Sequence, residues 1–226
     1  MDTAQITPYM FLGGYVQNRN VGRVIAQFED FALDGSTSSV LMMWNRNKEQ
    51  WHHFNLGWTA IALHVSKTGM MALSADGLLF SADASGTREV QIDETDQGPA
   101  NRGPLTDMQL IGDHLYAVGA KRQVYRRNDQ GAWSRADDGV LAPMDTKSET
   151  GFLSIHGLDE SLIIAVGSGG EIWRRAGDNW TQDSSPTSDS LHCVRVVKSN
   201  LAYASGENGT LLKWDGTDWA VVEPVS

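Results

Sequence analysis

The feature that most constrains this chain is an internal repeat. Four segments align without gaps, and one column of the alignment holds three glycines and a serine; the segments are LSADGLLFS (73–81), VGAKRQVYR (118–126), VGSGGEIWR (166–174) and SGENGTLLK (205–213). Successive members of that column, Ser74, Gly119, Gly167 and Gly206, are 45, 48 and 39 residues apart. Repeats of this length are single supersecondary units that bury their apolar faces by stacking on neighbours.

Each repeat contains the pattern of four short strands. Two apolar runs separated by a polar turn precede each glycine, in LTDMQLIGDHLYAVG (105–119), GFLSIHGLDESLIIAVG (151–167) and LHCVRVVKSNLAYASG (191–206). A third run, a turn and a run with a tryptophan follow. Alternation of period two and β-branched or aromatic residues predict strands, and Asn208-Gly209 predicts a tight turn. No window has a sustained period of 3.6, so we expect little or no helix.

Four-stranded units repeated about every 40–50 residues are typical of β-propeller blades. We therefore predict an all-β chain, a single β-propeller domain over 1–226 with five blades. The expected blades are 1–56, 57–103, 104–148, 149–188 and 189–226. The first is the most degenerate, with MFLGGYV, VGRVIAQF, FALD, VLMMW and WHHFNLG as its runs. An open stack that closes by dimerising is the rival architecture, and pairing of VVEPV (221–225) with the first strands stays open.

Composition limits the function classes. The 226 residues have 18 Lys and Arg against 28 Asp and Glu, a net charge of −10, which argues against binding a nucleic-acid backbone and favours a basic partner or simple solubility. A lone cysteine excludes an internal disulfide. The start MDTAQITPYMFLGG lacks the pattern of a signal peptide, and no apolar run is long enough for a membrane helix. We expect a cytoplasmic protein without membrane insertion.

The last 120 residues or so resemble a known group of repeats. AVGSGGEIWRRAGDNW (165–180) and ASGENGTLLKWDGTDW (204–219) have a glycine turn, a strand, a second turn and a tryptophan. In this they resemble the BNR/Asp-box and Ycf48-like β-propellers, which belong to the wider WD40/YVTN-like group. NDQGAW (128–133) is one residue shorter than an Asp box, and WDGTDW (214–219) also departs from it. The resemblance implies a propeller, and a fold does not by itself specify an activity.

The aromatic residues follow the repeat. We expect Trp51, Trp133, Trp180 and Trp219 to pack the outer strand of each blade against the next, because they recur at matching positions. Trp44, Trp58 and Trp214 fit the register less well, so they are the candidates for exposed interface anchors.

Residues for catalysis or metal binding are sparse. His52 and His53 are adjacent and would point to opposite faces of a strand, and no carboxylate recurs beside His156 and His192. Cys193 lies among apolar neighbours and is expected to be a buried, inert thiol. There is no Gly-x-Ser-x-Gly motif, and GSGG (167–170) is a turn between strands rather than a phosphate loop. We predict a protein that is not an enzyme and uses neither metal nor cofactor.

Acidic loops give the strongest indication of function. The connections at 93–104, 137–149 and 183–190 hold nine carboxylates and two basic residues. Propeller topology places such connections on one face, so we expect a negative surface that attracts a basic protein. The same composition is also common in ordinary solvated loops. The candidate partner-binding residues are Asp93, Glu94, Asp96, Asp137, Asp138, Asp145, Asp183 and Asp189.

These features favour a non-catalytic, protein-binding propeller. Its size, charge and lack of catalytic residues suit a bacterial immunity protein that neutralises a toxin. The alternatives are an assembly factor resembling Ycf48 and a sugar-binding lectin propeller, although the loops differ from blade to blade. A sialidase-type hydrolase is disfavoured because no catalytic set can be assembled. The identity of the partner and the oligomeric state do not follow from the sequence.

Overall fold

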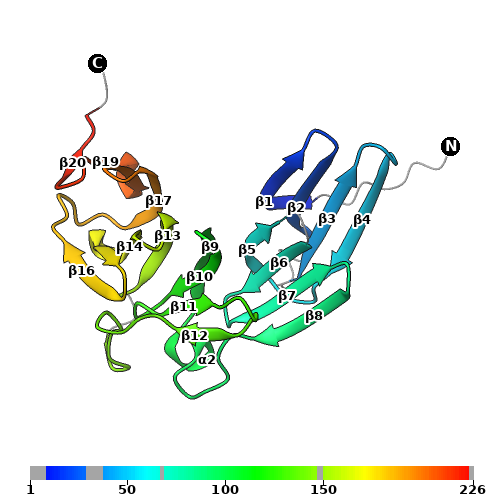
Figure 1. Ribbon diagram of the computed structural model, residues 1–226, viewed down its shortest axis with the longest axis horizontal. Coiled ribbons are helices and arrows are strands. Elements are labelled where there is room, and N and C mark those ends of the chain that lie inside the picture. The colour runs from blue at the N-terminus through cyan, green and yellow to red at the C-terminus, as the bar shows by residue number, and fades with distance from the viewer. Residues whose placement is uncertain (1–8, 29–37, 67–68, 147–149, 224–226) are drawn as a thin grey trace. The chain divides into compact units, whose positions relative to one another are not determined.

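The computed structural model describes residues 9–28, 38–66, 69–146 and 150–223, and it is built almost entirely of strands (Figure 1). Five antiparallel sheets each contain four strands consecutive in the sequence, which confirms the prediction of five four-stranded units. FALD (31–34) and the last residues of VVEPV lie outside the described part. The chain divides into two compact units, Met1–Gln91 and Ile92–Ser226, called unit 1 and unit 2 below.

Unit 1 contains sheets 1 and 2. Sheet 1 consists of β1 (Tyr9–Asn18), β2 (Val21–Phe28), β3 (Ser39–Asn45) and β4 (Gln50–Asn55). Sheet 2 consists of β5 (Ala60–Val65), β6 (Gly69–Ser74), β7 (Leu78–Asp83) and β8 (Gly86–Gln91). One buried cluster joins the two sheets through Ile25, Leu41, Leu56, Met70 and Phe80. Phe54 of sheet 1 lies 5.7 Å from Phe80 of sheet 2, measured between ring centroids.

Unit 2 contains three sheets in the same strand order. Sheet 3 consists of β9 (Leu105–Ile111), β10 (His114–Gly119), β11 (Val124–Arg127) and β12 (Trp133–Arg135). Sheet 4 consists of β13 (Phe152–Asp159), β14 (Leu162–Gly167), β15 (Ile172–Ala176) and β16 (Asn179–Asp183). Sheet 5 consists of β17 (Leu191–Lys198), β18 (Leu201–Gly206), β19 (Leu211–Trp214) and β20 (Trp219–Val221).

Helix within the described residues is confined to short turns. One of these, α2 (Pro99–Arg102), is α-helical and comes after sheet 2 and before sheet 3 in the sequence. Two 3₁₀ turns, η1 (Ser168–Gly170) and η2 (Glu207–Gly209), connect the second and third strands of sheets 4 and 5, where GSGG and Asn-Gly predicted turns. Of the helices within the described residues, none has the length and apolar character needed to cross a membrane.

The repeated glycine occupies one register position in every sheet of unit 2. Gly119 pairs with Leu105, Gly167 with Phe152 and Gly206 with Leu191, so each glycine lies opposite the start of the first strand. Gly167 and Gly206 have extended backbone that any residue can adopt. Glycine is needed at these positions because there is no room for a side chain. A β-carbon on Gly167 would overlap the carbonyl oxygen of Gly151. A β-carbon on Gly119 would likewise overlap the carbonyl oxygen of Pro104, and one on Gly206 that of Ser190.

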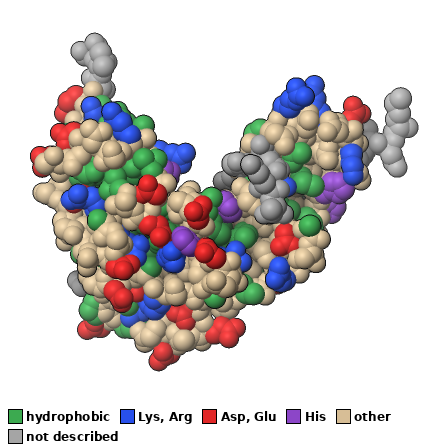
Figure 2. Space-filling view, viewed as in Figure 1, with side chains coloured by type: hydrophobic (Ala, Val, Ile, Leu, Met, Phe, Trp, Pro, Cys, Tyr) green, Lys and Arg blue, Asp and Glu red, His purple; other side chains and the backbone are tan. Residues whose placement is uncertain are grey.

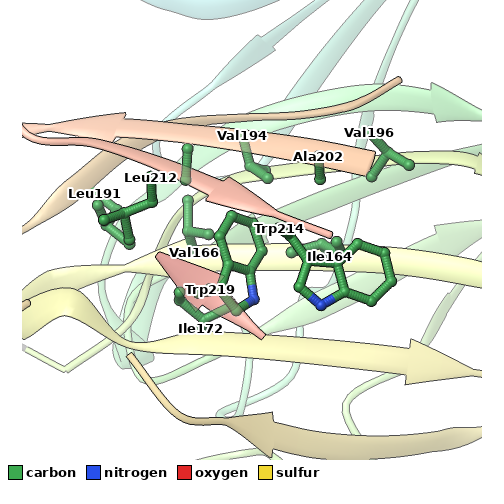
Figure 3. Close-up of a cluster of buried hydrophobic side chains, with 11 residues drawn as sticks. Ile164, Val166, Ile172, Leu191, Val194, Val196, Ala202, Leu212, Trp214 and Trp219 are labelled. Atoms are coloured by element: carbon green, nitrogen blue, oxygen red, sulfur yellow. The ribbon is translucent and has the colours of Figure 1, made fainter. Parts of the chain in front are cut away.

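The cores of unit 2 lie between its successive sheets. Sheets 3 and 4 enclose Tyr116, Val124, Phe152, Ile155 and Ile163 with others. Sheets 4 and 5 enclose Ile164, Ile172 and Leu191 together with Trp214 and Trp219, whose rings stack at 6.3 Å (Figure 3). Sheet 4 therefore buries both of its faces, one against sheet 3 and one against sheet 5, as expected of stacked repeats.

Three side chains differ from the sequence-based expectation. Cys193 is exposed, because β17 has a register shift between Leu191 and Cys193 that breaks the alternation of inward and outward side chains. Trp214 is 2% exposed and belongs to the core, since it shares the inward face of β19 with Leu212. Trp51 is 53% exposed and lies against Trp44 rather than in an intersheet core.

Candidate functional site

The acidic connections of unit 2 gather at one end of its sheets. In each meander the link to the next sheet emerges at the same end as the turn between the second and third strands. We call this end the loop face; it comprises residues 92–104, 120–123, 136–146, 150–151, 168–171, 184–190 and 207–210. Figure 2 shows acidic side chains along the lower edge of the unit, around the segment that carries α2. The predicted gathering of these loops therefore holds within unit 2.

The residue four positions after each repeated glycine ties the turn to a neighbouring loop. Gln123 donates its amide to the Gly103 carbonyl at 3.0 Å, and the Glu171 carboxylate accepts the backbone N–H of Gly151 at 3.0 Å. Thr210 donates its hydroxyl to Asp189. The loop face is therefore held in place by side chains at equivalent repeat positions.

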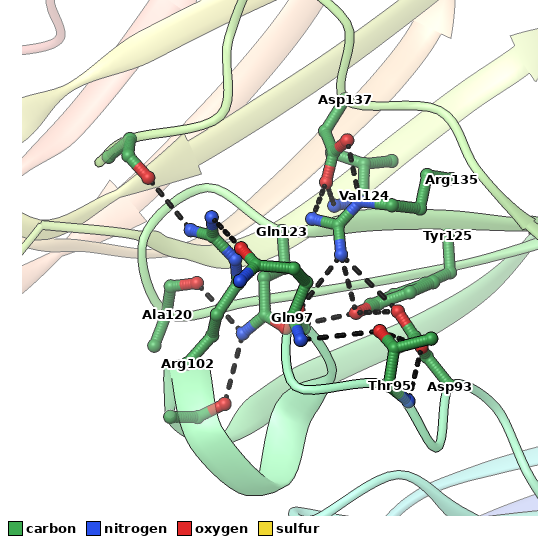
Figure 4. A network of polar contacts seen from close by, with 12 residues as sticks. Asp93, Thr95, Gln97, Arg102, Ala120, Gln123, Val124, Tyr125, Arg135 and Asp137 are labelled. Atoms are coloured by element: carbon green, nitrogen blue, oxygen red, sulfur yellow. Dashed lines mark hydrogen bonds and ion pairs between the residues drawn. The ribbon is translucent and has the colours of Figure 1, made fainter. Parts of the chain in front are cut away.

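Asp93 is the centre of one polar network (Figure 4). Its carboxylate accepts hydrogen bonds from the Thr95 backbone and hydroxyl, from the Tyr125 phenol at 3.2 Å and from Arg135 Nη1 at 3.3 Å. Burial alone would raise the pKa of Asp93, but the hydrogen bonds from Thr95 and Tyr125 and the positive charge of Arg135 hold it below its usual value. Asp93 therefore stays ionised and engaged inside the protein.

Asp137 and Asp183 are also engaged internally. The Asp137 side chain is 3% exposed, pairs with Arg135 Nη2 at 2.6 Å and accepts the backbone N–H of Val124. Asp183, whose side chain is 8% exposed, pairs with Arg174 Nη2 at 3.0 Å. Breaking such pairs would leave a buried charge without compensation. These two carboxylates therefore maintain the structure and are poorly placed to meet a partner.

One aromatic side chain in each sheet of unit 2 donates a hydrogen bond to the segment of the unit that precedes that sheet. Tyr125 of sheet 3 donates to Asp93, which follows sheet 2 in the sequence. Trp180 of sheet 4 donates its indole N–H to the Ala136 carbonyl, and Trp219 of sheet 5 donates to Asp183. The repeated aromatic residues thus act in intersheet packing, as predicted for Trp180 and Trp219.

The eight predicted binding residues separate into two groups. Asp93, Asp137 and Asp183 are paired internally, and Asp189 accepts bonds from Thr210 and Asn208 that lower its pKa. The second group consists of Glu94, Asp96, Asp138 and Asp145, which are exposed and form no side-chain hydrogen bond or ion pair within the described residues. These four carboxylates are the ones available to a partner.

A groove on the loop face was not anticipated from the sequence. It has a volume of about 690 Å³ and is lined by Arg122, Thr150, Ser168, Gly169, Glu171, Gln182, Ser188 and Ser190. We call it the Arg122 groove. Its lining is mostly hydroxyl and amide groups from separate repeats, and such residues are too common in loops to signal a site. The one distinctive sequence signal is Lys121-Arg122 where the other two repeats have Gly-Gly and Asn-Gly.

A second polar network joins sheets 3 and 4 near the opposite end. Arg126 Nε donates to Glu160 at 2.6 Å, and Arg175 Nη1 donates to the Tyr116 phenol at 3.1 Å. Both contacts join sheet 3 to sheet 4. The hydrogen bonds from Arg126, together with the one from Tyr116, lower the pKa of Glu160 to about 2. Partial burial acts in the opposite direction but is outweighed.

This depressed pKa predicts a dependence of stability on acid. A carboxylate with a lower pKa in the folded state stabilises the fold above its unfolded pKa, and this contribution is lost as the pH falls towards the folded pKa. From about pH 4.5 down to about 2, the wild type should lose more stability than Glu160→Gln. Urea unfolding at several pH values measures this difference. Parallel losses in both proteins would contradict the assignment.

The described residues offer no metal centre. No group of three or more His, Cys, Asp or Glu side chains in that part of the chain is arranged to hold an ion. His156 accepts the backbone N–H of Val196 at 3.2 Å, and burial, with a smaller effect from Arg195, lowers its pKa to about 4. His114 begins β10 and contacts Glu160 and Asp129.

Comparisons with known proteins give both a fold and one sequence relative. No protein-family model matches the chain. Solved structures with similar folds include YCF48 from Cyanidioschyzon merolae, with a TM-score of 0.64 and 12% identity, over 93% of this chain and 68% of that one. The WD40 β-propeller domain of Doa1 has a TM-score of 0.64 and 10% identity, over 96% and 72% of the two chains. The fold is that of a β-propeller, as predicted.

The protein that is similar to this chain in sequence is not one of these structural neighbours. The chain is 32% identical over 164 residues to Immune protein Tsi7 of Pseudomonas aeruginosa. The matched stretch is 73% of this chain and 54% of the relative, so the chain spans about half the length of that protein. The chain is thus a β-propeller whose sequence is similar to that of an immune protein.

Proposed function

We propose that this chain is a non-catalytic immunity protein that binds a toxin through the loop face of unit 2. The observation that carries the proposal is the 32% identity to Immune protein Tsi7 over 164 residues. Because the chain covers 54% of that relative, the function of the whole relative is transferred here only as a proposal. Neutralisation by binding requires no catalytic residues in the inhibitor, only a surface that covers the toxin's functional site.

The charge of the loop face supports a basic partner. Glu94, Asp96, Asp138 and Asp145 are exposed on it and carry no internal ion pair within the described residues. Solvent-exposed carboxylates raise the rate of association with a positively charged protein, and salt weakens the effect over a screening length of about 8–10 Å. We therefore expect the partner to be basic and its binding to weaken with salt.

The test is a pull-down from the native host with the wild-type chain as bait, at low and high salt, followed by mass spectrometry. The partner is then purified, and its affinity is measured for the triple variant Asp96→Lys, Asp138→Lys, Asp145→Lys. We expect the triple variant to bind at least about tenfold more weakly, mainly through slower association. Expression of the partner alone should also arrest growth, and co-expression of this chain should restore it.

A matched control separates the loop face from net charge. The variant Asp113→Lys, Asp129→Lys, Asp218→Lys changes the charge by the same amount in exposed turns at the opposite ends of the unit 2 sheets. It should bind the partner with the affinity of the wild type. Among the described residues, the side-chain contact that it removes inside the chain is the one between Asp129 and His114. Equal weakening by both triple variants would refute a specific loop face. A partner with no effect on growth would refute the toxin assignment.

Several finer assignments remain predictions. They are membership of the BNR/Asp-box group, a single domain over 1–226, a cytoplasmic location and function without a cofactor. The fold likeness to YCF48 concerns architecture at 12% identity, so it adds nothing in favour of an assembly role.

A further inference from the structure

The turn between β10 and β11 has an unusual backbone for its sequence. In sheets 4 and 5 the matching turns have positive φ at two successive positions, occupied by Gly169-Gly170 and Asn208-Gly209. In sheet 3 the same positions are Lys121 at φ 55° and Arg122 at φ 58°. Long side chains in the left-handed region raise the free energy of the folded state, and such outliers concentrate at functional sites.

Lys121 has a clear role within the loop face. Its ammonium group donates to the carbonyl oxygens of Met144 at 2.6 Å and Thr146 at 3.2 Å. Its own backbone N–H donates to the Thr150 carbonyl at 2.7 Å, and its carbonyl accepts the N–H of Ala142. Lys121 therefore fixes the 137–146 loop, which explains its presence in the strained turn.

Arg122 is fixed at one end only. Its Nε donates to Glu171 at 2.6 Å, and its guanidinium carbon lies 5.0 Å from the centroid of the Trp173 ring. Trp173 also donates its indole N–H to Glu171 at 3.2 Å. Among the described residues, no partner is found for the two terminal nitrogens of Arg122. The Arg122 guanidinium is thus held in one orientation. Its two terminal nitrogens are hydrogen-bond donors without a partner among the described residues, and they lie at the groove.

The rest of the groove matches an uncharged polar ligand. The charges of Arg122 and Glu171 offset each other, and the other lining groups are hydroxyls, an amide and a glycine backbone. Hydroxyls both donate and accept hydrogen bonds, whereas guanidinium only donates, so this combination fits alternating C=O and N–H groups. A sugar site would present an open aromatic face, but the groove has no aromatic lining and Arg122 lies over the Trp173 ring.

We propose that the Arg122 groove binds an extended main-chain segment of the protein partner. Arg122 donates to carbonyl oxygens of that segment, and Ser168, Ser188 and Ser190 bond its polar groups. The groove volume of about 690 Å³ is of the size that holds a short peptide segment. The inference rests on the proposed function, because it requires a protein partner, but it assigns a different part of the loop face from the exposed carboxylates.

The test uses a double variant that copies the other repeats. Arg122→Gly supplies the glycine found at Gly170 and Gly209, and Glu171→Gln supplies the amide that Gln123 provides at the equivalent position of sheet 3. The second change avoids leaving the Glu171 carboxylate buried without its cation. We expect the melting temperature to stay within about 5 °C of the wild type, because removal of backbone strain offsets the lost ion pair.

Affinity for the purified partner should fall at least about tenfold in the double variant, since hydrogen bonds from a charged donor are lost. Glu171→Gln alone keeps Arg122 and an amide oxygen that can accept from its Nε, so it should lose less affinity than the double variant. Calorimetry with the partner measures all three proteins.

Each other outcome overturns the inference. Wild-type affinity in the double variant would remove Arg122 from the interface while leaving the proposed function intact. A melting temperature lower by more than about 5 °C would show that Arg122 is retained for stability. A glycan that binds the wild type and not the double variant would assign the groove to sugar. If the wild type captures no partner, the proposed function fails together with the inference.

Discussion

Gly167→Ala should destabilise unit 2 by about 3 kcal/mol or more. Its backbone is extended, so the added methyl group creates no conformational strain. The cost arises because the β-carbon would overlap the carbonyl oxygen of Gly151 and approach the Cα of Phe152 at 3.0 Å. Both obstacles are backbone atoms, which cannot rotate away as a side chain can. Urea unfolding followed by tryptophan fluorescence measures the effect.

Gly169→Ala is the matched control, two residues along the same turn. Nothing lies within 4 Å of its added β-carbon, and its φ of +63° is the only obstacle. The expected cost is about 1 kcal/mol, the penalty for the left-handed conformation. If the two variants were equally destabilised, conformation rather than space would explain the repeated glycine. Gly206→Ala should behave like Gly167→Ala, since its β-carbon would meet the carbonyl oxygen of Ser190.

Trp214→Ala should cost about 4 kcal/mol, the largest loss expected from a single core truncation in this chain. The Trp214 ring is 2% exposed, stacks on Trp219 at 6.3 Å and lies under the Arg174 guanidinium at 5.5 Å. Figure 3 shows it among the aliphatic side chains of sheets 4 and 5. Removal therefore leaves a cavity lined by rigid strands. Thermal and urea unfolding both report the change.

Two variants define what Trp214 contributes. Trp214→Phe should retain most of the stability, because no hydrogen-bond partner is found for the indole N–H among the described residues. Trp51→Ala should cost below about 1.5 kcal/mol, because that ring is 53% exposed and packs against Trp44 of the neighbouring strand β3 rather than in an intersheet core. A loss at Trp51 as large as that at Trp214 would contradict the distinction between a core and a surface tryptophan.

The repeat carried most of the fold information. The spacing of Gly119, Gly167 and Gly206 predicted three four-stranded sheets, because a fixed register position recurs wherever the same supersecondary unit recurs. The exposure of Cys193 could not be predicted, since a single-residue register shift in β17 reverses the face of the residues that follow it. Alternation alone gives the wrong face there.

The sequence predicted which region of the chain forms the candidate site, but it did not predict which residues of that region are exposed. Topology gathers the acidic connections of unit 2 at one end of its sheets, but adjacent carboxylates there have opposite roles. Asp137 is buried against Arg135, whereas Asp138 is exposed. The Asp137 carboxylate pairs with Arg135, two residues earlier, and accepts the backbone N–H of Val124 on the neighbouring strand. The strand pairing that brings Val124 to Asp137 has no signature in the sequence next to Asp137. The Arg122 groove combines side chains from loops far apart in the chain, so only the three-dimensional arrangement shows it.

Some acidic residues of the loop face are paired inside the protein and others are exposed, and this difference affects how the choice of partner can evolve. Asp93 and Asp137 cannot change without disturbing their contacts with Tyr125 and Arg135 of sheet 3, and Asp183 accepts the bond from Trp219 that joins sheets 4 and 5. Glu94, Asp96, Asp138 and Asp145 make no such contacts within the described residues, so mutations there carry little stability penalty. Under the proposed function, specificity can therefore change at these four positions on an unchanged scaffold, and closely related chains can diverge towards different toxins.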